Sequence, residues 1–208
     1  MGSCASKLWA AKGDSWTWNG ISGTEAEGGG FVASTATISD SATVGPDARV
    51  YGTAKVEDNA KIKGHARVFG SATVDEFATV DEYARVYGEA RVRDSGVVKG
   101  HARVYGSAQV RDDAIVSGHA HVLETAVIRG NARVYENATI HGDSRVLGSA
   151  RVGGSAKIFG GVVVRDSAYI YENAVLFGDI TIKDRVCVRG YKRVSKKVGY
   201  TGDLVLGK

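Results

Sequence analysis

The hydrophobic positions of this chain repeat every six residues from Ala36 to Val188, without an insertion or deletion. In this range, each residue whose number is divisible by six has a small or aliphatic side chain. The residue two positions later is always Val, Ile or Leu. The residue two positions after the aliphatic one is a turn former or an acid, usually Gly, Asp or Glu. The small position is Ala except at Gly96, Ser144, Val162, Ile180 and Val186.

A period of six predicts a short strand with side chains that alternate inward and outward, followed by a turn. The small and the aliphatic residue point inward, and the two neighbours of the aliphatic residue point outward. The small residue lets the chain bend at a corner, and the aliphatic residue fills the interior. A helix is excluded because six is not a multiple of 3.6 and because β-branched residues dominate.

Residues eighteen positions apart resemble one another, which indicates three hexads per coil. Six of the eight residues in one such column are aromatic, and glycine follows nearly every one of them. This column is Tyr51, Phe69, Tyr87, Tyr105, Leu123, His141, Phe159 and Phe177. An acidic corner column begins Asp40, Asp58, Glu76, Asp94 and Asp112. We therefore predict an all-β, single-stranded, three-sided parallel solenoid of about nine coils, with 18 residues per coil.

The repeat resembles the hexapeptide-repeat family, in which an aliphatic residue is followed four positions later by a small one. The resemblance covers about three quarters of the chain, and it implies a left-handed parallel β-helix. Segments 64–70 (GHARVFG) and 100–106 (GHARVYG) are most similar to uninterrupted repeat proteins of bacteria and phages, which often carry a transferase label. The chain differs from the enzymes of the family in placing glycine two residues after the aliphatic position.

The expected organisation is one solenoid domain with two dissimilar ends. Residues 1–29 lack the hexad and contain Trp9, Trp16 and Trp18, so we expect them to cap the first coil with aromatic rings. Residues 30–191 form the solenoid. Residues 192–208 are basic and keep only echoes of the repeat, as expected for a degenerate last coil and a flexible end.

The formal net charge of +4 permits an acidic partner without requiring one. Two cysteines are too few for a disulfide framework, which favours a reducing, cytoplasmic location. No apolar run approaches the ~20 residues of a membrane span. Residues 1–7 match the myristoylation pattern at Gly2, with Cys4 as a palmitoylation site, so a eukaryotic host would allow membrane attachment. A chance match or cloning remnant is the favoured explanation.

On the first face, arginines alternate with the aromatic column on four successive coils. Arginine binds carboxylate or phosphate bidentately and rings stack on sugars or bases, so this surface could bind an acidic polysaccharide or a nucleic acid. We favour the structural alternative, in which the rings stack on one another and the arginines cover them. The set is Arg49 with Tyr51, Arg67 with Phe69, Arg85 with Tyr87, and Arg103 with Tyr105.

The other two faces suggest salt bridges and subunit contacts. The second face carries Arg93, Arg111, Arg129, Arg165 and Lys183 beside the acidic corner, which indicates solvated ion pairs. The third face exposes Val97, Ile115, Tyr135, Tyr169 and Tyr171 and is where subunits could meet.

Histidines raise the possibility of catalysis. His65, His101 and His119 share a corner column with Tyr83, whereas His121 and His141 lie on the first face. Hexapeptide-repeat acyltransferases, to which the chain is similar in fold, use a histidine base at a cleft between subunits of a trimer. By that resemblance the best candidates are His119 and His121. However, no loop interrupts the hexads to wall a cleft for acyl-CoA. A zinc site from His101, His119 and His121 is a remote alternative.

The sequence thus favours a structural, self-assembling scaffold that associates with itself, as a trimer or end to end. The alternative is a hexapeptide-repeat acyltransferase that uses acyl-CoA, and a third hypothesis is a binder of an acidic polymer. No metal is expected, and no cofactor apart from acyl-CoA in the enzyme hypothesis.

Overall fold

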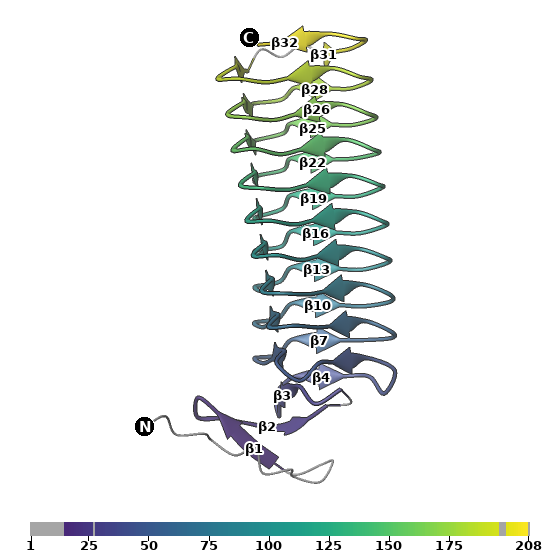
Figure 1. Ribbon diagram of the computed structural model, residues 1–208, viewed down its shortest axis with the longest axis vertical. Helices are drawn as coiled ribbons and strands as arrows, with labels where there is room; N and C mark the ends of the chain where they lie inside the picture. Colours follow the sequence, from purple (N-terminus) through teal and green to yellow (C-terminus); the bar gives the residue numbers. More distant parts are fainter. Residues whose placement is uncertain (1–14, 27, 196–198, 208) are drawn as a thin grey trace, which may run out of the picture.

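The computed structural model describes residues 15–26, 28–195 and 199–207. The coils stack along one axis into an elongated solenoid, with the strands β1 and β2 at its N-terminal end and β31 and β32 at the other (Figure 1). Gly2, Cys4 and Trp9 lie outside the described residues. The strands belong to three sheets, one for each side of the coil.

The first sheet has twelve strands, and its N-terminal edge is formed by a hairpin. In spatial order they are β1 (Ser15–Trp18), β2 (Ile21–Glu25), β3 (Phe31–Ala33), β6 (Arg49–Val50), β9 (Arg67–Val68), β12 (Arg85–Val86), β15 (Arg103–Val104), β18 (His121–Val122), β21 (Thr139–Ile140), β24 (Lys157–Phe159), β27 (Val175–Phe177) and β30 (Arg193–Val194).

The second sheet has ten parallel strands. They are β4 (Thr37–Ile38), β7 (Lys55–Val56), β10 (Thr73–Val74), β13 (Arg91–Val92), β16 (Gln109–Val110), β19 (Val127–Ile128), β22 (Arg145–Val146), β25 (Val163–Val164), β28 (Thr181–Ile182) and β31 (Gly199–Tyr200).

The third sheet also has ten parallel strands. They are β5 (Thr43–Val44), β8 (Lys61–Ile62), β11 (Thr79–Val80), β14 (Val97–Val98), β17 (Ile115–Val116), β20 (Arg133–Val134), β23 (Arg151–Val152), β26 (Tyr169–Ile170), β29 (Cys187–Val188) and β32 (Val205–Leu206).

The pairing register confirms the 18-residue coil. Val50 is the partner of Val68 and Val68 the partner of Val86, and the same spacing holds in all three sheets. Ten strands in the second and third sheets make ten coils, against the predicted nine or so. The difference comes from β30, β31 and β32, which lie in the segment expected to be a degenerate last coil.

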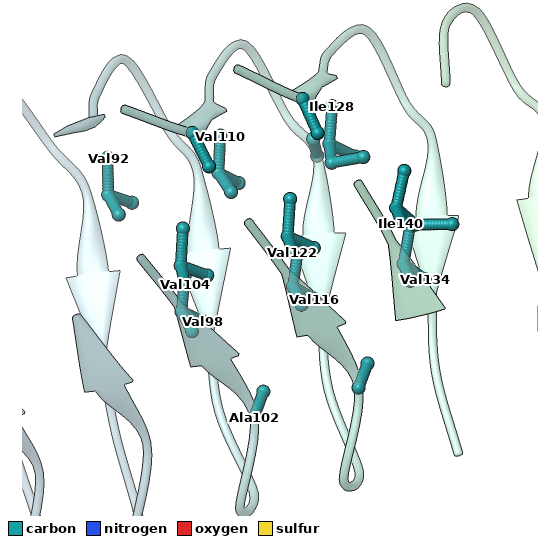
Figure 2. Close-up of a cluster of buried hydrophobic side chains, with 14 of the residues drawn as sticks. Val92, Val98, Ala102, Val104, Val110, Val116, Val122, Ile128, Val134 and Ile140 are labelled. Carbon is teal, nitrogen blue, oxygen red and sulfur yellow. The ribbon is translucent and has the colours of Figure 1, made fainter. Parts of the chain in front are cut away.

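The interior is a single apolar column filled by the two inward positions of each hexad. Nearly all of these alanines and aliphatic residues have no exposed surface. Figure 2 shows the aliphatic side chains of successive coils pointing into this interior. Ser144 is the buried polar exception among the described residues, and its hydroxyl donates to the carbonyls of His141 (2.8 Å) and Gly160 (3.1 Å).

Every sixth residue from Gly52 to Gly190 has a positive φ, which explains the glycine-or-acid position of the repeat. Where an acid stands there, its carboxylate often accepts a hydrogen bond from the same corner position one coil later. Gly130 N–H donates to Asp112 Oδ2 and Gly142 N–H donates to Glu124 Oε2, each at 2.8 Å. These bonds satisfy corner N–H groups and offset the conformational cost of a left-handed non-glycine residue.

At the N-terminal end, β1 and β2 form an antiparallel hairpin that pairs through β2 with β3. The Trp18 ring lies against Phe31 and Tyr51, with ring centroids 5.9 and 5.4 Å away. The hairpin therefore ends the aromatic column of the first face. The described residues contain no helix long and apolar enough to span a membrane.

Candidate functional site

A hollow of about 470 Å³ runs along the corner between the third and first sheets. We call it the first groove. It is lined by His65, Arg67, Tyr83, Arg85, His101, Arg103, His119 and His121. Both histidines predicted as candidate bases, His119 and His121, are therefore brought together, and three of the predicted arginines join them.

One wall of the first groove is the corner column of rings. The ring centroids of His65 and Tyr83 are 4.9 Å apart, those of Tyr83 and His101 4.9 Å, and those of His101 and His119 4.8 Å, all in stacked arrangement. This spacing follows from the separation of neighbouring strands. The wall is consequently regular and preorganised over four coils.

The opposite wall is a column of guanidinium groups. Arg67, Arg85 and Arg103 are register partners on β9, β12 and β15, so three like charges follow one another at the strand spacing. None of the three forms an ion pair with a carboxylate among the described residues. Such an array attracts anions, because guanidinium groups bind phosphate and carboxylate bidentately.

His121 continues the arginine column on β18, where it is the register partner of Arg103. The pKa of His121 is lowered from its ordinary value of 6.5, chiefly by burial and further by the charges of Arg103 and His119. The imidazole is therefore neutral at neutral pH, which is the state that accepts a proton. A neutral histidine beside a row of cations can act as a general base on a bound anionic substrate.

The aromatic column lies outside the first groove. Tyr51, Phe69, Tyr87 and Tyr105 stack face to face, with centroid distances of 4.8 to 4.9 Å and interplanar angles of 2° to 3°. Because each inner ring has neighbours on both faces, its faces are not free to stack on sugars or bases. Their arrangement fits the structural alternative, and polymer binding by these rings stays a prediction.

Arg49 also differs in position from the other three arginines of the predicted ladder. Its Nη1 donates to the carbonyls of Pro46 (3.1 Å) and Ala48 (2.8 Å), and its guanidinium lies 6.0 Å from the Trp18 ring centroid. Arg67 also reaches this ring, at 5.7 Å. The Arg49 side chain thus packs at the N-terminal end of the solenoid.

The structure gives the remote zinc hypothesis no geometric support in the part of the chain that it describes. It contains no group of three His, Cys, Asp or Glu residues placed to hold one metal ion. The stack holds His101 and His119 ring over ring, which suits packing rather than convergence of their nitrogens on a common point.

On the second face, the predicted ion pairs are largely replaced by corner hydrogen bonds. Asp94 accepts from the N–H of Asp112 (2.9 Å) and Asp166 accepts from that of Asp184 (3.2 Å). One long contact remains, from Arg165 Nε to Asp166 Oδ2 at 4.0 Å. The carboxylates of this corner therefore mainly accept hydrogen bonds from backbone N–H groups.

Sequence reasoning missed the pairing of the histidine column with the arginine column. The sequence pattern places His65, Tyr83 and His101 on one corner but does not assign them to a site with Arg85 and Arg103. The available signal was the separation of two positions between His101 and Arg103, which puts both side chains outward around a buried alanine.

No protein-family model matches the chain, and no curated protein sequence matches it. Its structure is similar to the crystal structure of LpxA, a UDP-N-acetylglucosamine acyltransferase from Bacteroides fragilis, with a TM-score of 0.52. The identity is 18%, and the alignment covers 80% of this chain and 71% of that chain. At this identity the likeness establishes the fold alone, a left-handed parallel β-helix.

Proposed function

We propose that the chain belongs to the hexapeptide-repeat family and is an acyltransferase that takes its acyl group from acyl-CoA. The acceptor is an amine or a hydroxyl, and the reaction takes place in the first groove. The observation that carries this proposal is the placement of His121, a half-buried histidine with a lowered pKa, at the end of a row of arginines that form no ion pair with a carboxylate among the described residues.

The arginine row suits the donor. Coenzyme A carries several phosphate charges, and Arg67, Arg85 and Arg103 offer guanidinium groups at a regular spacing on adjacent coils. We assign these side chains to the phosphates. Binding the nucleotide part there leaves the acyl end of the donor at the His121 end of the row.

His121 suits the proton transfer. The imidazole takes the N–H or O–H proton of the acceptor as the acceptor's nitrogen or oxygen attacks the thioester carbonyl. The tetrahedral intermediate then collapses, the C–S bond breaks, and the coenzyme A thiolate receives the proton from the imidazolium. His119 stacks on His101 in the corner column and bounds the groove.

The groove needs a further wall, since the side chains of Arg85, Arg103, His101 and His119 are exposed and the hexads carry no inserted loop. We propose that a second copy of the chain supplies that wall in a homo-oligomer. The likeness to an acyltransferase of the same fold supports this function at the level of fold.

A structural scaffold is the second candidate, favoured by the terminal coil. Within the described residues β30, β31 and β32 are the last strands of their sheets, so they present unpaired edges that could pair with another chain. The antiparallel β1–β2 hairpin covers the opposite edge of the first sheet, which prevents a flush head-to-tail continuation of that sheet. For this reason we rank end-to-end assembly below catalysis.

The test is release of thiol from acetyl-CoA and longer acyl-CoAs in the presence of amine and hydroxyl acceptors. His121→Gln should lower the rate at least about a hundredfold, the usual contribution of a general base. His141→Gln is the matched control, because His141 lies on the same sheet face but stacks on Phe159 at 5.1 Å, outside the groove. Equal rates for wild type and His121→Gln would contradict the assignment.

A further inference from the structure

A second hollow, of about 320 Å³, lies on the outer face of the third sheet. We call it the second groove. It is lined by Lys99, Ile115, Ser117, Arg133, Tyr135 and Arg151. We propose that it binds a small phosphorylated compound that carries an aromatic or apolar group, independently of the function proposed for the first groove.

The first step of the argument is that Tyr135 is a fixed wall. Its ring lies directly over Gly153, where a Cβ atom would clash with the ring carbons. Its hydroxyl donates a hydrogen bond of 2.9 Å to the hydroxyl of Tyr169, two coils away in the chain direction. Tyr169 is itself held by stacking on Tyr171 at 4.6 Å.

The orientation of the Tyr135 side chain, which points toward the C-terminal coils, accounts for the hollow. Ser117, Tyr135 and Gly153 occupy equivalent positions on three successive coils, and the ring occupies the space that a side chain at position 153 would fill. Ser117 on the preceding coil is small, so space opens between it and the ring. The pattern of small, large and absent side chains is what distinguishes this part of the third sheet.

The second step concerns charge. Arg133 and Arg151 are direct register partners on β20 and β23, and like charges at this spacing destabilise a sheet. Lys99 adds a third cation to the same hollow. The ion pairs of the described residues include none of the three.

The corner acid that follows Tyr135 forms no ion pair with these cations among the described residues. Glu136 follows Tyr135, and its Oε2 accepts the N–H of Gly154 at 2.6 Å. A bound dianion would therefore meet two forked guanidinium groups and an ammonium group that hold no carboxylate in an ion pair within the described residues. Phosphate fits this donor set, since arginine binds it bidentately and lysine binds it as a point charge.

The third step concerns the rest of the ligand. Ile115 and the Tyr135 ring give the hollow an apolar side, and a pocket with a few polar groups against an apolar wall is typical of small-molecule sites. Burial and the Tyr169 hydroxyl raise the pKa of Tyr135, so the phenol stays protonated and does not repel an anion. The ligand class is therefore an organic phosphate in preference to inorganic phosphate.

The experiment is a titration of the full chain with phenyl phosphate. Binding is monitored through the backbone amide chemical shifts in two-dimensional NMR spectra. We expect saturable shifts at Lys99, Ser117, Tyr135 and Arg151, and weaker binding of inorganic phosphate. The double variant Arg133→Gln/Arg151→Gln, whose changes are at exposed positions, should bind at least about tenfold more weakly. Gly153→Ala should also weaken binding, because it displaces the Tyr135 ring.

Arg67→Gln/Arg85→Gln is the matched control, with two register-paired arginines removed from the first groove. It should leave the affinity for phenyl phosphate at the second groove unchanged. Three results would each overturn the proposal: no saturable shifts at the second groove, unchanged affinity in Arg133→Gln/Arg151→Gln, or equal affinities for inorganic and phenyl phosphate. None of these outcomes depends on acyl transfer, so a failure of this proposal would not bear on the function proposed for the first groove.

Discussion

Arg103 and His121 are direct register partners on β15 and β18, and the guanidinium charge helps burial to lower the pKa of the imidazole below 6.5. Protonation of His121 is thus disfavoured, and the neutral base persists to more acidic pH than for an ordinary histidine. This relationship connects the arginine row, which suits an anionic donor, with the group that would move the proton.

The first prediction follows from that pKa shift. Titration of the His121 imidazole by NMR should give a midpoint below 6.5, and Arg103→Gln should raise it part of the way back. The rise is partial because burial, the larger cause, remains. The acid limb of any acyl-transfer rate should move to higher pH in the same variant. A wild-type midpoint at or above 6.5 would contradict the assignment of His121 as a neutral base.

The second prediction concerns the aromatic column. Tyr87 stacks on Phe69 and on Tyr105, each at 4.8 Å, so Tyr87→Ala removes two ring pairs. We expect the free energy of unfolding to fall by about 1 to 3 kcal/mol, measured by chemical denaturation. Tyr191→Ala is the control, because Tyr191 is 86% exposed, and its effect should stay within about 0.5 kcal/mol. Similar losses in both variants would argue against a stabilising role for the stack.

The third prediction separates the two contributions of a corner acid. Asp112 has a φ of 58°, and its carboxylate accepts the N–H of Gly130. Asp112→Ala loses the hydrogen bond and keeps the left-handed strain, at a cost of about 1 to 2 kcal/mol in the free energy of unfolding. Asp112→Gly loses the same bond but relieves the strain, so it should be the more stable variant. If alanine proves equal to glycine, backbone strain does not explain the corner composition.

The fourth prediction concerns self-association. If a second copy walls the first groove, light scattering should show a fixed oligomer over a range of concentrations. Mass that grows continuously with concentration would instead favour end-to-end assembly through β30, β31 and β32. A monomer at every concentration would remove the proposed second wall and weaken the acyltransferase assignment.

Much of the fold could be predicted because the hexad assigns one structural role to each position. Ala102 and Val104 point inward and Arg103 points outward because of their place in the repeat, and the 18-residue period places Arg103 beside Arg85. The N-terminal hairpin could not be predicted in the same way, because residues 15–25 carry no hexad. The tenth coil is hard to predict because its inward positions are degenerate: Lys192 stands at a small position, and Leu204 at another is 39% exposed.

The sites were harder to predict, because a column defines where a side chain starts and not where it points. The arginines of the first face could have covered either the aromatic rings or the histidine corner, and packing decides between them. The lean of Tyr135 over Gly153 is likewise a relation between two coils that no single hexad encodes.

The central claim, that the first groove holds the anionic donor of an acyl transfer, is tested most directly by the affinity for acetyl-CoA. Isothermal titration should show saturable binding to the wild-type chain, weakened at least about tenfold in Arg85→Gln/Arg103→Gln. Binding should be little changed in the control Arg145→Gln, which lies on the second sheet. An absence of saturable binding, or equal affinity in the double variant and the wild type, would contradict the account.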